Sequence, residues 1–392
     1  MKDGCKILGK IAYYSFYLAV VIEVLIVIVD KSAYINPIEG RLFQLTFLLF
    51  TVKTALTKYS WKEYIVILLF LLLGAVSYFV TGRNEIVRVV MFMAACKDID
   101  MQKCLKLVFY MTLTGCAVII LLSVTGIYGA MSLTQDYGRG SVETRYTLGL
   151  GHPNALQCMV WALTTLGLYL YGTKMKWYYY LVVLGVNTGF FLLTDSRTSL
   201  LVTVLVMVLA YMVHMRNLVL RKISAVVCMA ISIFSVGISV IIAGNAYRVY
   251  NYVWHGDCTP VTMVFTTLNK IFNGRIRILV ENDRFEGTVI TWRLFSRPEN
   301  NYYFDMGWIR LFYWYGIIPA CIFVGALILL MYFCYREKKY IELVMIASFS
   351  LYSIIEAHAI SVYLARNYLF FIMGAYWYYL PVVRRQNTDG VL

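Results

Sequence analysis

Charged residues are scarce in this chain of 392 residues. They make up 14% of it, whereas hydrophobic residues make up 61%. A soluble domain of ordinary composition is about 25% charged. The composition therefore excludes an ordinary soluble enzyme and a disordered chain.

The chain also lacks the cysteine and glycine patterns that mark metal, disulfide and nucleotide sites. Its nine cysteines are scattered and include no Cys-x-x-Cys pair, and most lie inside apolar runs, where thiols behave as small hydrophobes. No glycine-rich phosphate loop is present, and no His, Asp or Glu set has the spacing of metal ligands. We therefore expect no metal, no cofactor and no disulfide framework, and no nucleic-acid partner.

Long apolar runs are what the chain does have. Crossing a bilayer takes about 20 apolar residues, and twelve runs are candidates, of which the fourth is short. They cover 11–29, 41–57, 62–80, 84–96, 104–126, 149–172, 177–194, 197–214, 219–243, 306–335, 340–357 and 361–381. The sequence predicts an all-α, polytopic integral membrane bundle of about twelve transmembrane helices.

The basic residues indicate the orientation of this bundle, because cytoplasmic segments carry an excess of Lys and Arg. With the N-terminus inside, every inside segment holds at least two basic residues, and both termini are predicted to be cytoplasmic. Fourteen of the nineteen basic residues assigned inside are Lys, whereas fourteen of the sixteen assigned outside are Arg. Since the planar guanidinium suits phosphate and carboxylate, the outer face is predicted to bind an anion; snorkelling of Arg at the interface is the alternative.

One long connection divides the chain. Residues 1–243 hold nine predicted spans, 244–305 form a large extracytoplasmic loop, and 306–392 hold three spans and a cytoplasmic tail. The other connections are expected to be short. The loop is rich in apolar residues, so we expect it to fold on the membrane surface, with an amphipathic helix over 261–280 on the outer leaflet.

Three polar stretches on the predicted outer side are candidate sites. The first holds Arg145, His152 and Asn154, with Pro153 at a helix start. The second is the tight turn of Asp195 and Arg197, where the alternative is a helix cap beside a snorkelling Arg. The third is the long loop, which ends at Asp305 and includes the candidate arginines Arg275, Arg277 and Arg293. Later in the chain, Glu356 and His358 are expected to form an ion pair.

These stretches, in this order, resemble the O-antigen polymerase and O-antigen ligase superfamily, and most closely the Wzy-type capsular and exopolysaccharide polymerases of Gram-positive bacteria. The matching pieces are R-Y-T-L-G-L-G-H-P-N at 145–154, T-D-S-R at 194–197, L-N-K-I-F-N-G-R at 268–275, D-M-G-W-I-R-L-F-Y-W-Y-G-I-I at 305–318 and Y-S-I-I-E at 352–356. The resemblance covers roughly 145–370.

The resemblance implies a bundle akin to the membrane glycosyltransferases of the C type (GT-C). It implies transfer of a growing glycan from undecaprenyl diphosphate onto a new lipid-linked repeat unit at the outer face of the plasma membrane, with inversion and without metal or nucleotide. The implied partners are the lipid-linked oligosaccharide, membrane lipid, a chain-length regulator and a flippase.

The motifs also imply residue roles. Arg197 and Arg275 match the arginines expected to stabilise the departing diphosphate, followed by Arg145, Arg277 and Arg293. Ligases of this superfamily often carry His eleven positions before the Gly of the tenth span; here that position is Asp305. It implies a carboxylate base, although an N-cap of the tenth helix is the alternative role. His152, Asn154 and Asp195 are candidate glycan or structural contacts.

Two other functions stay open. A ligase would hand finished glycan to a surface acceptor, and the Asp at 305 favours the polymerase over it. A flippase for lipid-linked oligosaccharides or a secondary transporter belongs to another class. Transporters often show internal repeats and charges near the midplane, and we detect neither in the sequence.

Overall fold

The computed structural model describes residues 2–137, 142–280, 285–357 and 363–379. Its helices and its two strands follow one another along the chain. They are α1 (Lys2–Lys31), α2 (Glu39–Ala55), α3 (Trp61–Thr81), α4 (Glu85–Ala95), α5 (Met101–Val124), β1 (Ser132–Asp136), β2 (Val142–Tyr146), α6 (Pro153–Tyr171), α7 (Trp177–Thr194), α8 (Arg197–His214), α9 (Leu218–His255), α10 (Pro260–Ile271), α11 (Gly307–Tyr315), α12 (Ile317–Arg336), α13 (Tyr340–Tyr352) and α14 (Tyr368–Tyr376). The sequence predicts an all-α bundle, and the described residues are nearly all-α, with one two-stranded hairpin besides the helices.

Eight helices of the described residues are long and apolar enough to cross a membrane. They are α1, α3, α5, α6, α7, α8, α9 and α12. Each of the twelve predicted runs contains a helix, but α2, α4, α13 and α14 are shorter than these eight. The structure therefore supports a membrane-embedded bundle with eight full-length candidates.

Local sequence signals fix where helices begin and end, as α3 illustrates. Ser60 stands at its N-cap, where the hydroxyl accepts from the Glu63 N–H and the Glu63 carboxylate accepts from the Ser60 N–H. These reciprocal bonds satisfy two donors that a helix start leaves unpaired. At the other end Gly82 takes the left-handed conformation that closes many helices.

The predicted run 306–335 is two helices rather than one. It breaks at Gly316, whose backbone has φ 98° and ψ 173°, so α11 and α12 meet at a bend. The N–H groups of Ile317 and Ile318 at the start of α12 bond to the carbonyl oxygens of Arg293 and Leu294, at 2.8 and 3.0 Å. The preceding loop thus takes the place of the interrupted helix in satisfying these donors.

The connection between α5 and α6 is a second structured connection, contrary to the expectation that only 244–305 is long. Here β1 and β2 pair antiparallel, with Leu133 opposite Arg145. The predicted loop also begins later than expected, because α9 continues past residue 243 to His255. The amphipathic helix expected over 261–280 is α10, which ends at Ile271.

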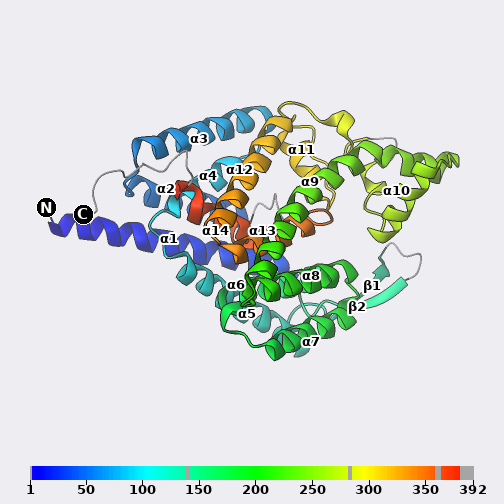
Figure 1. Cartoon of the computed structure of the whole chain (residues 1–392), viewed down its shortest axis with the longest axis horizontal. Coiled ribbons are helices and arrows are strands. Elements are labelled where there is room, and N and C mark those ends of the chain that lie inside the picture. The colour runs from blue at the N-terminus through cyan, green and yellow to red at the C-terminus, as the bar shows by residue number, and fades with distance from the viewer. Residues whose placement is uncertain (1, 138–141, 281–284, 358–362, 380–392) are drawn as a thin grey trace.

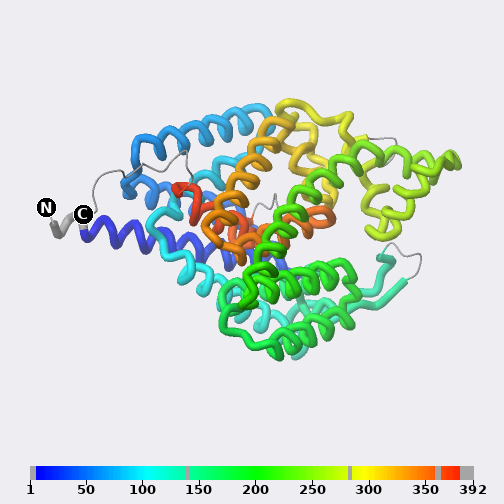
Figure 2. The backbone as a smooth tube through the Cα atoms, in the orientation of Figure 1, coloured from blue at the N-terminus to red at the C-terminus, as the bar shows by residue number. Residues whose placement is uncertain are grey.

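Figure 1 shows where these pieces lie. The hairpin and α10 lie at one end of the molecule, on the right of the view, and the beginning of α1 lies at the opposite end. Figure 2 follows α9 as one continuous tube from the middle of the bundle to α10. The buried helix α13 packs against α8, α9 and α6. The long helices therefore bring the hairpin, the α7–α8 turn and the loop after α10 to one end.

Candidate functional site

A polar cavity of about 390 Å³ lies at this end of the bundle. Seven of the nine predicted site residues line it: Arg145, His152, Asn154, Asp195, Arg197, Arg275 and Asp305. Further polar walls come from Asp136, Tyr137, Lys270, Asn273, Tyr352 and Glu356. Stretches far apart in the sequence thus meet around one space.

Arg275 is largely enclosed in the cavity wall, and it contacts two acidic residues from distant parts of the chain. Its Nη2 lies 2.8 Å from Oε1 of Glu356, and its Nε lies 3.6 Å from Oδ2 of Asp305. The Arg275 side chain is 13% exposed, and that of Asp305 is 39% exposed. One guanidinium therefore joins the end of the long loop to the segment after α13, and the Asp305 carboxylate still faces the cavity.

The β-hairpin contributes Arg145. Its Nη2 lies 2.6 Å from Oε2 of Glu143 and 3.5 Å from Oδ2 of Asp195, at the α7–α8 turn. Its guanidinium also lies over the ring of Tyr137, 4.1 Å from the ring centre, a favourable cation–π contact. The carbonyl of Tyr137 accepts a hydrogen bond from Nδ2 of Asn273 at 2.8 Å. These contacts fasten the hairpin to both α7–α8 and the turn after α10.

The α7–α8 turn directs Asp195 and Arg197 toward the same space. Asp195 adopts a left-handed conformation with φ 49° as it closes α7, and Ser196 stands at the N-cap of α8 without a side-chain capping bond. A side-chain N-cap of α8 therefore does not account for the Asp195 carboxylate, which contacts Arg145 and lies 3.4 Å from Nε of Arg197. At 68% exposure, Arg197 is the most open of the site's paired arginines.

His152 has a structural role that is visible in its contacts. It is the N-cap of α6, and its Nδ1 accepts a hydrogen bond from the backbone N–H of Asn154 at 3.1 Å. The neutral imidazole therefore carries its proton on Nε2. Burial lowers the pKa of His152 below its ordinary value, with Arg145 and Arg275 adding to the effect and Asp305 opposing it.

The glycines before His152 allow this loop to lie close to the bundle. Gly149 has φ 81°, and an added Cβ there would lie 3.0 Å from the carbonyl oxygen of Ile119 and from Cβ of Ser123, both in α5. A side chain at this position would clash with α5 and require a strained backbone. The motif L-G-L-G-H-P-N thus sets the approach of the loop to the cavity.

Asp305 is not a helix cap, which is the alternative that the sequence left open. The helix α11 begins at Gly307 with Met306 at the N-cap, and no side chain caps it. The Asp305 carboxylate instead forms an ion pair with Arg275. A cap therefore does not explain the acid at this position.

The cavity floor is a packed hydrogen-bonded layer. Tyr352 and Ser199 both line the cavity, and their hydroxyl oxygens lie 2.5 Å apart. The Tyr352 ring stacks on Trp161 with centres 4.3 Å apart, and the Trp161 Nε1–H donates to Ser348 at 3.0 Å. Since these groups are buried, the floor is held in one arrangement.

Two predicted residues do not line this cavity. Arg277 is exposed and its backbone N–H donates to Oδ1 of Asn269. Arg293 is exposed at the bend between α11 and α12, where its carbonyl accepts from Ile317. The expected pairing of Glu356 with His358 concerns a residue outside the described ranges, and Glu356 itself pairs with Arg275.

Several cavity residues were not assigned as site residues from the sequence: Asp136, Tyr137, Lys270, Ser199, Tyr352 and Glu356. The piece Y-S-I-I-E at 352–356 carried a signal, because it begins and ends with two of them. Asp136 and Tyr137 gave none, since the hairpin that positions them was not expected.

The cavity combines four basic side chains with four acidic ones: Arg145, Arg197, Lys270 and Arg275 with Asp136, Asp195, Asp305 and Glu356. Such a set binds an anionic group through guanidinium hydrogen bonds and presents carboxylates able to accept a proton. Comparisons with known proteins add no assignment: no family model, curated protein or solved structure matches the chain.

Proposed function

We propose that this protein is a Wzy-type polysaccharide polymerase, a membrane glycosyltransferase. It transfers a growing undecaprenyl-diphosphate-linked glycan onto a new lipid-linked repeat unit. The observation that carries this proposal is the meeting of Arg145, Arg197, Arg275 and Asp305 around one polar cavity at an end of an apolar helical bundle.

The arginines and the acid support the two halves of such a reaction. The acceptor hydroxyl attacks the anomeric carbon of the donor glycan, and the bond between that carbon and the diphosphate oxygen breaks. The diphosphate leaves with the electron pair, and Arg197 and Arg275 stabilise its growing negative charge. The hydroxyl proton passes to Asp305, whose carboxylate faces the cavity.

The membrane setting belongs to the same proposal. The cavity faces the outside of the bacterial plasma membrane, both termini lie in the cytoplasm, and the chain crosses the membrane twelve times in a GT-C-like bundle. The eight full-length helices and the clustering of arginines at the end with the cavity support this arrangement. Shorter helices such as α13 supply the remaining crossings.

Deletion of the gene in its own host tests the function. Surface polysaccharide and lipid-linked glycan are sized after complementation with wild type, Arg275→Ala or Asp305→Ala, at matched membrane levels. A polymerase predicts single repeat units without long chains in the deletion strain and in both variants.

Other outcomes identify the alternatives. Long lipid-linked chains that never reach a surface acceptor indicate a ligase. Repeat units held on the inner leaflet indicate a flippase and refute the catalytic roles given to Arg275 and Asp305.

A further inference from the structure

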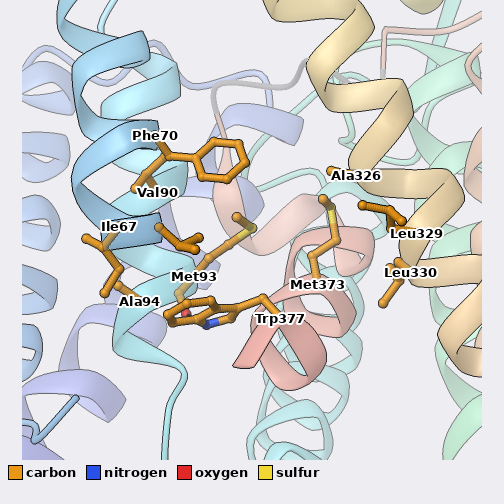
Figure 3. A pocket seen from close by; sticks show the side chains of 11 residues that line it. Ile67, Phe70, Val90, Met93, Ala94, Ala326, Leu329, Leu330, Met373 and Trp377 are labelled. Atoms are coloured by element: carbon orange, nitrogen blue, oxygen red, sulfur yellow. The ribbon is translucent and has the colours of Figure 1, made fainter. Parts of the chain in front are cut away.

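The hollows of the bundle differ in whether they offer a place for an anion. Figure 3 shows one of about 190 Å³, with Ile67 and Phe70 on one side, Leu329 and Leu330 on the other, and the indole of Trp377 at one end. No charged side chain of the described residues lines it. The polar cavity, by contrast, is lined by four basic side chains, so a cation that receives an anion is to be sought there.

Lys270 differs from the other three cations of the polar cavity because it has no acidic partner. The three lining arginines all contact carboxylates; they are Arg145, Arg197 and Arg275. Lys270 forms no ion pair with any acid of the described residues, Asp136 in the same cavity wall included. An anion can therefore bind Lys270 without displacing a counter-ion.

The fold holds Lys270 in the cavity wall. It lies in the last turn of α10, whose inner face is anchored by the buried side chains of Thr262 and Phe265. The chain then turns at Asn273, whose Nδ2 donates to the carbonyl of Tyr137 in the hairpin segment at 2.8 Å. Because both sides of Lys270 are anchored, its backbone stays beside the cavity, while its side chain is exposed.

An exposed apolar face of α10 indicates the kind of molecule that carries the anion. Val261, Val264 and Ile271 recur at helical spacing and are all exposed. The preceding helix α9 is a candidate membrane span that ends at His255, so the apolar face of α10 is suited to lie on the membrane surface. Ile271 also lines the polar cavity, as Lys270 does. One ligand with an apolar chain and a charged group can therefore contact both.

We propose that Lys270 is a further substrate-binding residue, which binds the diphosphate of a lipid-linked glycan as it enters the cavity from the membrane surface. This inference rests on the proposed function. The ammonium group suits such a contact, because it is a compact charge on a flexible stem and binds phosphate without a fixed fork geometry. From Lys270 the diphosphate passes to the arginines, where it displaces their acidic partners.

Binding of geranylgeranyl diphosphate to the purified full-length protein in detergent tests this role. The uncharged alcohol geranylgeraniol is the comparison ligand, and each titration is made at low and at high salt. Lys270→Gln removes the charge, and Lys270→Arg keeps it. Lys106→Gln is the matched control, because Lys106 is exposed on α5 and does not line the cavity.

Wild type is expected to bind the diphosphate more tightly than the alcohol, and added salt should weaken only the binding of the diphosphate. Lys270→Gln should weaken diphosphate binding by about fivefold at low salt, the upper range for one exposed charge pair, and should reduce its dependence on salt. Lys270→Arg and Lys106→Gln should bind as wild type does. The alcohol should bind equally to all four proteins.

Two results would overturn the role of Lys270 alone. One is equal diphosphate binding by wild type and Lys270→Gln at low salt. The other is a loss in Lys270→Gln that the alcohol shares, since that indicates a change of structure rather than of charge. A wild type that binds the diphosphate no better than the alcohol would contradict the proposed function as well, so the two failures are distinguishable.

Discussion

Gly316, at the bend between α11 and α12, gives the sharpest test of this fold. Its φ of 98° and ψ of 173° lie in a region that is essentially restricted to glycine. An added Cβ would lie 2.7 Å from Leu294 O, Phe295 Cα and Ser296 N. These are backbone atoms, so no side-chain rotation relieves the clash. We therefore expect Gly316→Ala to destabilise the protein.

The magnitude follows from two costs. The strained backbone costs about 1–3 kcal/mol. Relief of the clash pushes the loop away and weakens the bonds from Ile317 to Arg293 and from Ile318 to Leu294, each contributing about 1 kcal/mol. The sum is about 3–5 kcal/mol. With an unfolding entropy of roughly 2.1 cal/mol/K per residue over 392 residues, Tm should fall by about 4–6 °C.

Thermal unfolding of the detergent-solubilised protein measures this shift. Gly325→Ala is the matched control, because Gly325 lies within α12 and an added Cβ there meets nothing within 4 Å. Alanine stabilises a helix interior by about 0.5–1 kcal/mol relative to glycine, so the control should unfold at an equal or slightly higher temperature. If Gly316→Ala unfolds no lower than Gly325→Ala, the bend does not require glycine.

Three further predictions concern the cavity. Arg275→Ala should abolish long glycan chains whereas Arg277→Ala should retain most of them, because only Arg275 lines the cavity; equal loss would contradict this geometry. Glu356→Ala should lower the free energy of unfolding by roughly 1–3 kcal/mol through loss of a charged hydrogen bond to Arg275, and Glu356→Gln, which keeps an acceptor, should lower it less in the same melting assay. Because burial lowers the pKa of His152 below the ordinary value of 6.5, the unfolded state binds more protons than the folded state as pH falls below that value. Stability is therefore lost as pH falls toward the lowered pKa. His152→Asn keeps a good N-cap and should flatten the decline in Tm between about pH 7 and pH 5; an unchanged decline would assign the effect to another group.

The sequence predicted the helices well where hydropathy and caps agree. The runs 177–194 and 197–214 coincide with α7 and α8, because a polar turn at Asp195 and Ser196 separates them. The bend at Gly316 was missed, since it lies in an unbroken apolar run and is set by a loop distant in sequence. The hairpin was missed because both strands are short and largely exposed.

The candidate site was predictable to the extent that motifs carried it. Arg145, Arg197, Arg275 and Asp305 were named from their motifs, and the structure brings them to one cavity; their roles in catalysis stay predictions. From the sequence, Arg275 and Arg277 were both predicted to contact the diphosphate. In the structure they follow a turn at Asn273 and Gly274, which both have positive φ, and only Arg275 lines the cavity. Glu356 shows the same limit, because its partner lies 81 positions earlier in the chain.

The pairing of arginines with internal acids has a consequence for what the cavity accepts. Glu143 and Asp195 already hold Arg145, and Asp305 and Glu356 already hold Arg275. A ligand reaches these arginines by exchange with a built-in counter-ion. Chloride or a single carboxylate offers no more than the acid it displaces, whereas a diphosphate offers several charged oxygens at once. Under the proposed function, the resident acids therefore favour a multiply charged ligand such as a diphosphate over small monovalent anions.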